Sequence, residues 1–302
     1  GEKEIESSWH DQLSEELVKP EEGFRDNAAA VAGQVLQHPI GQQAIFRAYE
    51  LLTGIITGVP ERLKPFHERY RFLCVVGCPR HVGSYLTKQL YLALGLDGEK
   101  VPNVIAHDGF PDASPFNLKE GYNAATNMTQ NTAEYLAMVE LFFANSRIFN
   151  NLVMVPKKLT KAAYHGAFFN TIFGPGTEYI ITLRHPVAAC ISTYEKSTGL
   201  PDDTLFKVRG NIEEWARRDN VFTGEDPERI FQKDYFDVYL RYWEQYHYNL
   251  ALTGLAANRN WTVVVYGGER MTNLARSFFS RFKSKSAPED FKVFDKRDLH
   301  QG

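Results

Sequence analysis

The chain has 302 residues, of which 43% are hydrophobic and 24% are charged, close to the averages for globular proteins. These proportions exclude a largely disordered, collagen-like or coiled-coil protein. With 34 Lys and Arg against 37 Asp and Glu, the formal net charge is −3, so the chain lacks the overall basic field that holds long nucleic acids. We therefore expect no nucleic-acid partner, and we expect local groups to hold any anionic ligand.

The number of cysteines and the length of the apolar runs indicate the cellular compartment in which the protein is expected. Cys74, Cys78 and Cys190 are too few for a disulfide framework and form no Cys-x-x-Cys pair, which favours a reducing compartment and no zinc site. No stretch reaches the roughly 20 apolar residues of a membrane span, and the N-terminus has no signal-peptide pattern. We expect a cytoplasmic protein without an integral membrane segment, and we leave open a leader or anchor removed before Gly1.

The N-terminal part of the chain is predicted to be helical. Between Asn27 and Ile56, apolar residues recur at three- and four-residue spacings. His38-Pro39 is expected to divide this segment into two helices, because proline disfavours helical geometry in the residue before it. We expect residues 1–70 to form a helical extension packed on the core, or alternatively a lid, and residues 71–302 to form one α/β domain.

Short apolar runs alternate with helical stretches from residue 71 onwards. Each run is apolar almost throughout, which is typical of parallel strands buried on both faces. A long helix with an aromatic stripe is expected to begin near Asp226 and to reach Leu250. The pattern predicts an α/β fold with a five-stranded, mainly parallel, doubly wound sheet. The five predicted strands are Phe72–Gly77, Asn103–Ala106, Leu152–Val155, Tyr179–Leu183 and Trp261–Val265.

The turn after the first predicted strand has the composition of an anion-binding loop. It reads Gly77-Cys-Pro-Arg-His-Val-Gly-Ser-Tyr85 and leads into a predicted helix. N–H groups at a helix N-terminus attract anions and glycine permits close approach, while Arg80 and Ser84 add a cation and a hydroxyl. A Walker A loop has a lysine where Ser84 stands, which disfavours an ordinary ATPase or kinase. A plain strand-to-helix turn is the alternative.

A second candidate anion site follows the fourth predicted strand. Leu183-Arg184-His185-Pro186 ends that strand, and Ser192 lies eight residues after Arg184, at the start of a predicted helix. Open α/β sheets bind ligands beyond the carboxyl ends of their strands, where an arginine can make charge-assisted hydrogen bonds to phosphate oxygens. The sequence therefore predicts two anion sites.

The two motifs together resemble those of the PAPS-dependent sulfotransferases, where PAPS is 3′-phosphoadenosine 5′-phosphosulfate. Pro79 to Ser84 is similar to the loop that holds the 5′-phosphosulfate in that family, with Val82 as an extra residue. The second motif is similar to the one that holds the 3′-phosphate, with His185 in place of an acidic residue or Asn. The resemblance implies that PAPS is bound by Arg80, His81, Val82, Gly83, Ser84, Tyr85, Arg184 and Ser192.

The resemblance extends from about Phe72 to Ser197, with a weaker similarity at 264–269. It implies a fold of the P-loop nucleotide-kinase-like type. It also implies a sulfotransferase that moves the sulfuryl group of PAPS, its co-substrate, to a hydroxyl or amine of a small molecule, lipid or carbohydrate, without a metal. The alternatives are a Mg²⁺-dependent, P-loop kinase-like phosphotransferase and a catalytically inactive nucleotide-binding scaffold.

The resemblance further implies catalytic residues at two other strand ends. The family has a lysine at the end of the third strand, where counting back from Arg184 favours Lys158, with Lys157 as the second choice. It commonly has a general base near the end of the second strand, where His107 and Asp108 stand. His107 is favoured because a neutral imidazole accepts a proton near pH 7, and Asp108 is either the base or a group that orients His107. A solvated basic pair and a surface histidine are the alternatives.

The acceptor is not defined by the sequence. Its pocket is expected within residues 20–70, 109–130 and 198–248, whose aromatic side chains suit a sugar, a lipid or a small alcohol equally well. The sequence also leaves the oligomeric state open.

Overall fold

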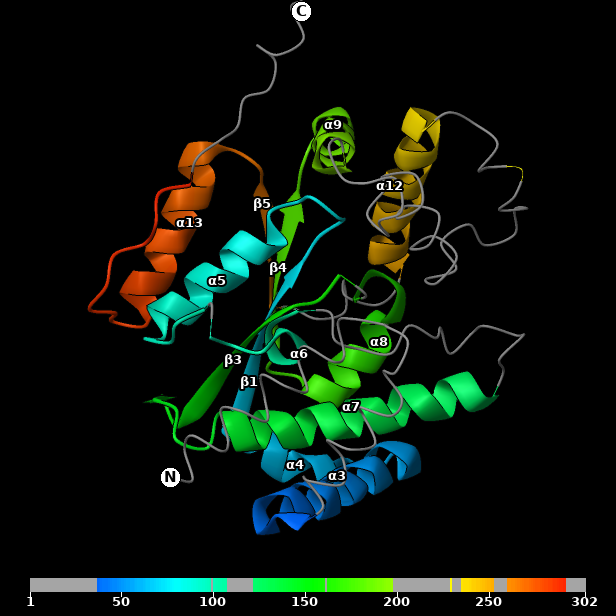
Figure 1. Cartoon of the computed structure of the whole chain (residues 1–302), viewed down its shortest axis with the longest axis vertical. Helices are drawn as coiled ribbons and strands as arrows, with labels where there is room; N and C mark the ends of the chain where they lie inside the picture. Colours follow the sequence, from blue (N-terminus) through cyan, green and yellow to red (C-terminus); the bar gives the residue numbers. More distant parts are fainter. Residues whose placement is uncertain are drawn as a thin grey trace, which may run out of the picture.

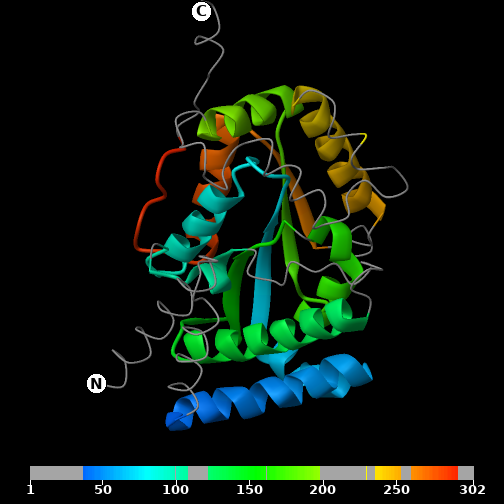
Figure 2. The ribbon, with the colours of Figure 1, turned by 45° about the vertical axis from the view of Figure 1, so that its right-hand side comes forward.

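The computed structural model describes residues 37–98, 100–107, 122–160, 162–197, 229, 235–252 and 260–291. In these residues the chain is an α/β protein in which helices flank a curled, mixed sheet of five strands (Figures 1 and 2). None of the helices in the described ranges is both long enough and apolar enough to span a membrane. The predicted α/β class is confirmed.

The elements follow one another in the order helix, strand and helix through most of the described chain. The strands are β1 (Tyr70–Val76), β2 (Ile148–Phe149), β3 (Leu152–Lys158), β4 (Glu178–Leu183) and β5 (Trp261–Val265). The helices are α3 (Pro39–Thr57), α4 (Pro60–Arg69), α5 (Gly83–Ala93), α6 (Asn103–Ala106), α7 (Tyr122–Phe142), α8 (Ala162–Phe173), α9 (Pro186–Ser197), α12 (Tyr235–Leu252) and α13 (Gly268–Arg281).

The strand order determines where the connections of the chain diverge. The order is β2-β3-β1-β4-β5, with β1 parallel to both β3 and β4, and β4 parallel to β5. The chain leaves β1 towards the β3 side and leaves β4 towards the β5 side. Connections that diverge in this way mark a topological switch point, and open α/β sheets bind ligands beyond the carboxyl ends of the strands there. The switch point lies between β1 and β4.

Three features of the sheet differ from the sequence prediction. The apolar run Trp261–Val265 was predicted as a strand buried on both faces, but β5 is an edge strand whose residues are mostly exposed. The sheet is mixed instead of mainly parallel, because β2 is an edge strand that pairs antiparallel with β3. Residues 103–106, predicted as the second strand, form the short helix α6. The N–H groups of Ile105 and Ala106 both donate to the Pro102 carbonyl, at 2.9 and 3.0 Å, so this turn satisfies locally the groups that a strand would pair with a neighbour. Both side chains are nevertheless buried, which explains the strand-like apolar pattern.

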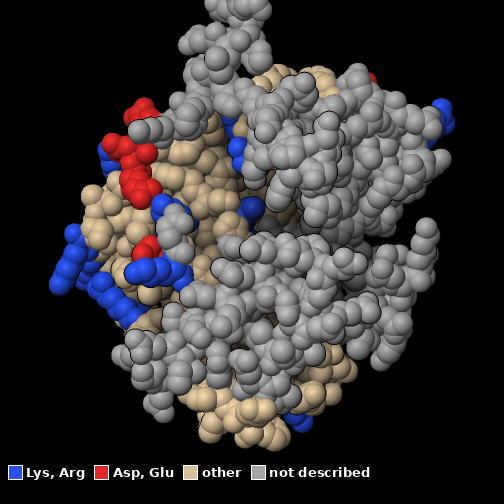
Figure 3. Space-filling view, viewed as in Figure 1, with Lys and Arg blue, Asp and Glu red and all other residues tan. Residues whose placement is uncertain are grey.

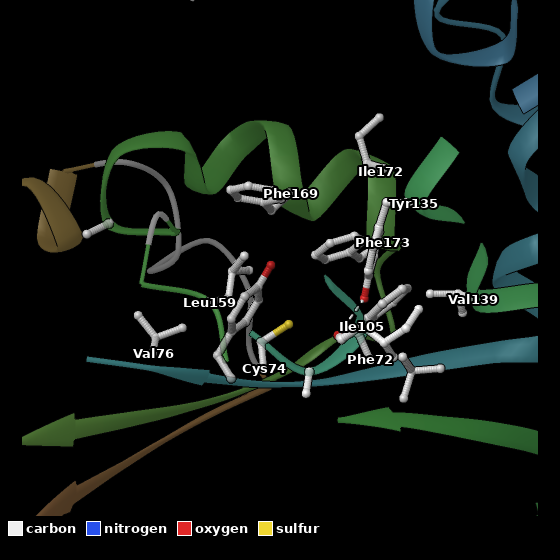
Figure 4. Close-up of a cluster of buried hydrophobic side chains, with 14 of the residues drawn as sticks. Phe72, Cys74, Val76, Ile105, Tyr135, Val139, Leu159, Phe169, Ile172 and Phe173 are labelled. Atoms are coloured by element: carbon white, nitrogen blue, oxygen red, sulfur yellow. Dashed lines mark hydrogen bonds between the residues drawn. The ribbon is translucent and has the colours of Figure 1, made fainter. Parts of the chain in front are cut away.

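The core has two buried clusters, one on each face of the sheet. Phe72, Cys74 and Val76 of β1 face α7 and α8, and Phe72 stacks on Phe173 with ring centroids 4.0 Å apart (Figure 4). The intervening β1 residues, such as Val75, face α5 and α13 on the other side. Burial on both faces accounts for the continuous apolar run from which β1 was predicted.

The helices α3 and α4 lie beyond α7, at the end of the molecule opposite α9 (Figure 1). Pro39 opens α3, and the His38 side chain accepts a hydrogen bond from the Ile40 N–H at 3.3 Å, so the predicted break at His38-Pro39 is the start of α3. Arg47 on α3 donates from Nε and Nη2 to the Glu140 carboxylate on α7, at 2.8 and 3.0 Å. Residues 1–36 lie outside the described ranges, so the predicted helix before His38 and the domain boundary at residue 70 stay predictions.

Candidate anion-binding site

The loop between β1 and α5 has an unusual backbone. Arg80 and Val82 have positive φ angles of 67° and 69°, a region in which residues with side chains are strained, β-branched valine most of all. The first hydrogen bond into α5 runs from the Leu86 N–H to the Val82 carbonyl at 3.2 Å. The N–H groups of the first turn precede this bond, so they have no acceptor within the helix. The start of α5 therefore offers several N–H groups and the positive end of a helix dipole to an anion.

The two predicted arginine motifs meet at the switch point between β1 and β4. Arg184 Nη1 donates to the backbone carbonyl of Arg80 at 3.0 Å, across 104 residues of sequence. Arg80 Nε and Nη2 both donate to Ser192 Oγ on α9, at 3.3 Å each. The Arg184 guanidinium lies over the Tyr266 ring, with Cζ 4.3 Å from the ring centroid. The two segments predicted to form anion sites are thus in direct contact.

The two guanidinium groups have no carboxylate partner among the described residues. Partial burial lowers the pKa of Arg80, and burial together with the nearby Arg80 charge lowers the pKa of Arg184. The Arg184 Nε is buried and has no hydrogen-bond partner in the described structure. A desolvated cation with an unsatisfied donor destabilises the fold unless an acceptor binds it. This pair is therefore suited to an anionic ligand.

The charged residues on the described surface are only partly visible in this view. In Figure 3, a few Lys and Arg atoms reach the surface near the middle of the face, and other Lys and Arg atoms lie at the left beside the Asp and Glu atoms. In Figure 2, β1 and β4 both run upwards, so the loops at their carboxyl ends lie at the same end of the sheet.

The side chains of the two lysines at the end of β3 contact different parts of the chain. Lys157 is fully buried, and its Nζ donates to the carbonyls of His107 at 2.6 Å and Ile105 at 3.4 Å. The Lys158 side chain runs past the start of α5, where a Cβ on Gly83 would lie 3.3 Å from Lys158 Cε. A cation beside a helix N-terminus is unfavourable unless an anion lies between them. The geometry therefore favours Lys158 as the lysine of the site, while Lys157 supports the turn at α6.

His81, predicted to bind the nucleotide, has its side chain inside the protein, with 1% of the residue exposed. Its Nδ1 lies 3.0 Å from the Thr182 carbonyl, and the Trp243 indole N–H donates to its Nε2 at 3.2 Å. Because a carbonyl only accepts and an indole N–H only donates, the ring is neutral with its proton on Nδ1. The His81 side chain therefore holds the loop to β4 and α12, and only the backbone of this residue is available to a ligand.

The other predicted residues are distributed as follows. Ser84 is exposed in the first turn of α5, and Tyr85 donates from its hydroxyl to the Glu289 carbonyl at 2.7 Å. Val82 is partly buried against the cluster on the α5 side of the sheet. The His107 backbone is held by Lys157, which keeps this residue near the end of β3. Asp108 lies outside the described residues, and so do residues 20–36, 109–121, 198–228 and 230–234 of the predicted acceptor segments.

Three contributors to the site were not predicted. Tyr266, directly after β5, supports Arg184, and α12 supplies Trp243 to His81 and the Tyr239 hydroxyl to the Pro79 carbonyl at 3.1 Å. The aromatic stripe on α12 indicates a helix face packed in the core, and it does not indicate these polar contacts. The sequence signal that could have predicted these contacts is the aromatic type, since the Tyr hydroxyl and the Trp N–H need hydrogen-bond partners when buried.

Lowering the pH is expected to destabilise the protein through His81. Burial lowers the pKa of His81 from 6.5 to about 3 in the folded state, so the unfolded chain takes up this proton first. The contribution of neutral His81 to stability is complete above about pH 6.5 and is lost as the pH falls towards 3, and at pH 4.5 the loss amounts to roughly 2–3 kcal/mol. Urea unfolding at pH 7.5 and pH 4.5 measures this change.

The His81→Asn variant is the control for this titration, because it keeps a donor for Thr182 and cannot be protonated. Its stability is expected to fall less between the two pH values, by roughly the same 2–3 kcal/mol. An identical fall in the wild type and the variant would assign the acid sensitivity to other groups.

Comparison with known proteins found no matching protein family, no matching curated protein and no matching solved structure.

Proposed function

We propose that the protein is a PAPS-dependent sulfotransferase with a P-loop-like nucleotide site at the switch point between β1 and β4. The contact between Arg184 and the Arg80 backbone carries this proposal, because it joins the two motifs into one site for a ligand with phosphate groups at both ends. Neither arginine has an acidic partner among the described residues, and the Arg184 Nε has no partner there at all. A nucleotide such as PAPS provides acceptors for both guanidinium groups.

In this proposal, a different set of protein groups binds each end of the nucleotide. The first-turn N–H groups of α5, together with Arg80 and Ser84, bind the 5′-phosphosulfate. Arg184 and Ser192 bind the 3′-phosphate, and Ser192 Oγ, which accepts from Arg80, still has its own hydrogen to donate. The second set selects PAPS over nucleotides without a 3′-phosphate.

The proposed reaction is a direct transfer of the sulfuryl group. The acceptor oxygen attacks sulfur in line, the bond from sulfur to the 5′-phosphate oxygen breaks, and adenosine 3′,5′-bisphosphate leaves with the electron pair. His107, or Asp108 beside it in the sequence, takes the proton of the acceptor hydroxyl. Lys158 stabilises the charge that develops on the bridging oxygen, an effect worth about 3–4 kcal/mol for a well-aimed donor. Alignment of the two substrates supplies much of the remaining acceleration.

The test compares adenosine 3′,5′-bisphosphate with ADP, each measured with and without Mg²⁺, for binding to the full chain by calorimetry. We expect tighter binding of adenosine 3′,5′-bisphosphate, independent of Mg²⁺, because only this nucleotide has a 3′-phosphate for Arg184. Arg184→Gln is expected to remove most of the preference, about 10–100-fold in Kd, which corresponds to one charge-assisted contact. Arg241→Gln on the exposed face of α12 serves as the matched control and should bind like the wild type.

Two results would contradict the proposal. Equal affinity for the two nucleotides removes the role given to Arg184, and a Mg²⁺-dependent preference for ADP indicates the kinase-like alternative. Transfer of labelled sulfate from PAPS to a panel of sugars, lipids and small alcohols then distinguishes an enzyme from a nucleotide-binding scaffold.

A further inference from the structure

The chain after α13 folds back along α5 and α13 towards the candidate site (red in Figures 1 and 2). We name residues 284–291 the C-terminal strap. The Glu289 carbonyl accepts from the Tyr85 hydroxyl at 2.7 Å, and the Glu289 N–H donates to Gln89 Oε1 at 3.0 Å. The Phe291 N–H donates to Thr272 Oγ1 on α13 at 3.3 Å. These bonds fix the strap to both helices and place Phe291 at its end.

Phe291 connects the strap to Arg184 through a series of aromatic rings. Its ring centroid lies 4.7 Å from that of Tyr85 and 5.6 Å from that of Tyr266, and it meets the Tyr266 ring at 87°. The Tyr266 ring also contacts the Arg184 guanidinium, whose Cζ lies 4.3 Å from the ring centroid. The strap, Tyr266 and Arg184 therefore form one continuous set of contacts.

The orientation of Arg184 depends on this platform. Its guanidinium makes one hydrogen bond in the described structure, to the Arg80 carbonyl, and its Nε makes none. The Tyr266 backbone is fixed by its N–H bond to the Leu183 carbonyl at 2.7 Å, so only the side chain is free to turn when a neighbouring ring is lost. A long side chain that is not held in its binding geometry loses rotamer freedom when the ligand binds, and this loss weakens affinity.

We propose that Phe291 is a positioning residue, which holds the Tyr266 ring against Arg184 and so presets the guanidinium for the 3′-phosphate. The identity of the ligand rests on the proposed function, whereas the aromatic contacts do not. Phe291 contacts the Tyr85 ring in the first motif and the Tyr266 ring, and its effect on Arg184 passes through Tyr266.

The experiment measures, for each variant, the ratio of the affinities for adenosine 3′,5′-bisphosphate and AMP, which reports the contribution of the 3′-phosphate alone. Phe291→Ala is expected to reduce this ratio about 5- to 10-fold, Phe291→Leu by a smaller factor, and Phe291→Tyr should restore it. Phe149→Ala is the matched control. Phe149 packs edge-on against Phe282 at 5.1 Å, in the same hydrophobic cluster but at β2, so its loss should lower the melting temperature and leave the ratio unchanged.

The outcomes separate the two proposals. A wild-type ratio near one contradicts the proposed function and this inference with it. A high ratio in the wild type that persists in Phe291→Ala overturns the positioning role and leaves the proposed function standing. If Phe291→Ala does not fold, Phe291→Leu decides, and an unchanged ratio there overturns the inference equally.

Discussion

Replacing Gly77 by alanine is expected to lower the free energy of unfolding by about 2–3 kcal/mol. Gly77 directly follows β1, where the strand lies close to β4. A Cβ at this position would overlap Thr182 Oγ1, and it would also lie 3.1 Å from His81 Cβ and 3.3 Å from the Thr182 carbonyl oxygen. The crowding atoms belong to a short buried side chain and to the backbone, so relief requires β1 and β4 to separate. Chemical denaturation at pH 7.5 measures the change.

Two further variants test whether this cost comes from crowding. Gly267→Ala changes the glycine after β5, where a new Cβ meets its nearest neighbour, Arg270 Cδ, at 3.9 Å, so we expect a cost below about 1 kcal/mol. Thr182→Ala removes the overlapping hydroxyl, so Gly77→Ala should cost less in that background than in the wild type. Equal costs in both backgrounds would contradict the crowding explanation, and so would an equal cost at Gly267.

The same close approach fixes the loop after β1, which contains the candidate anion-binding site. Thr182 donates from Oγ1 to the Val76 carbonyl at 3.2 Å, and its own carbonyl accepts from His81. These two bonds fix the end of β1 and the loop to β4. Arg184, two residues after Thr182 in the chain, thereby reaches the Arg80 carbonyl. The packing that brings the two arginine motifs together is thus part of the sheet itself.

The sequence predicted the central strands well because burial on both faces gives an unbroken apolar run. The same signal failed at residues 103–106, because three apolar residues after Asn103 fit a turn of helix as well as a strand. Pro102 was the residue that could have indicated a turn here. Its carbonyl accepts the two N–H bonds that close the turn. The edge strand β2 is two residues long, too short to leave an alternating pattern.

The site was predictable in its parts but not in its arrangement. Strand ends and a helix start located Arg80 and Arg184, since these positions follow from local pattern and from the general placement of ligands in α/β sheets. Alternation along a strand predicts that Lys157 and Lys158 point to opposite sides, but only the packing of α5 and α6 decides which one reaches the loop. The role of His81 depends on Trp243, 162 residues further along the chain, and no local signal reports that contact.

The neighbouring lysines at the end of β3 are expected to give opposite results when each is replaced by methionine. In the proposed reaction, Lys158→Met should reduce the rate of sulfuryl transfer about 100- to 1,000-fold, because it removes the donor assigned to the charge that develops on the leaving group. Its free energy of unfolding without ligand should fall less than that of Lys157→Met, since Lys158 is only partly buried. Lys157→Met should lower the free energy of unfolding by about 1–3 kcal/mol, because the His107 carbonyl loses the donor that Lys157 provides at 2.6 Å.

Turnover of labelled PAPS and urea unfolding, measured on both variants, distinguish these roles. Methionine keeps most of the length and the apolar stem of lysine, so neither substitution opens a large cavity. Lys157→Met is also expected to lose some activity, since His107 is held through its backbone by this lysine, but the loss should come with a lower denaturation midpoint. A stable Lys157→Met that has lost all turnover, beside an active Lys158→Met, would exchange the two roles and place the transferring group on the α6 side of the sheet.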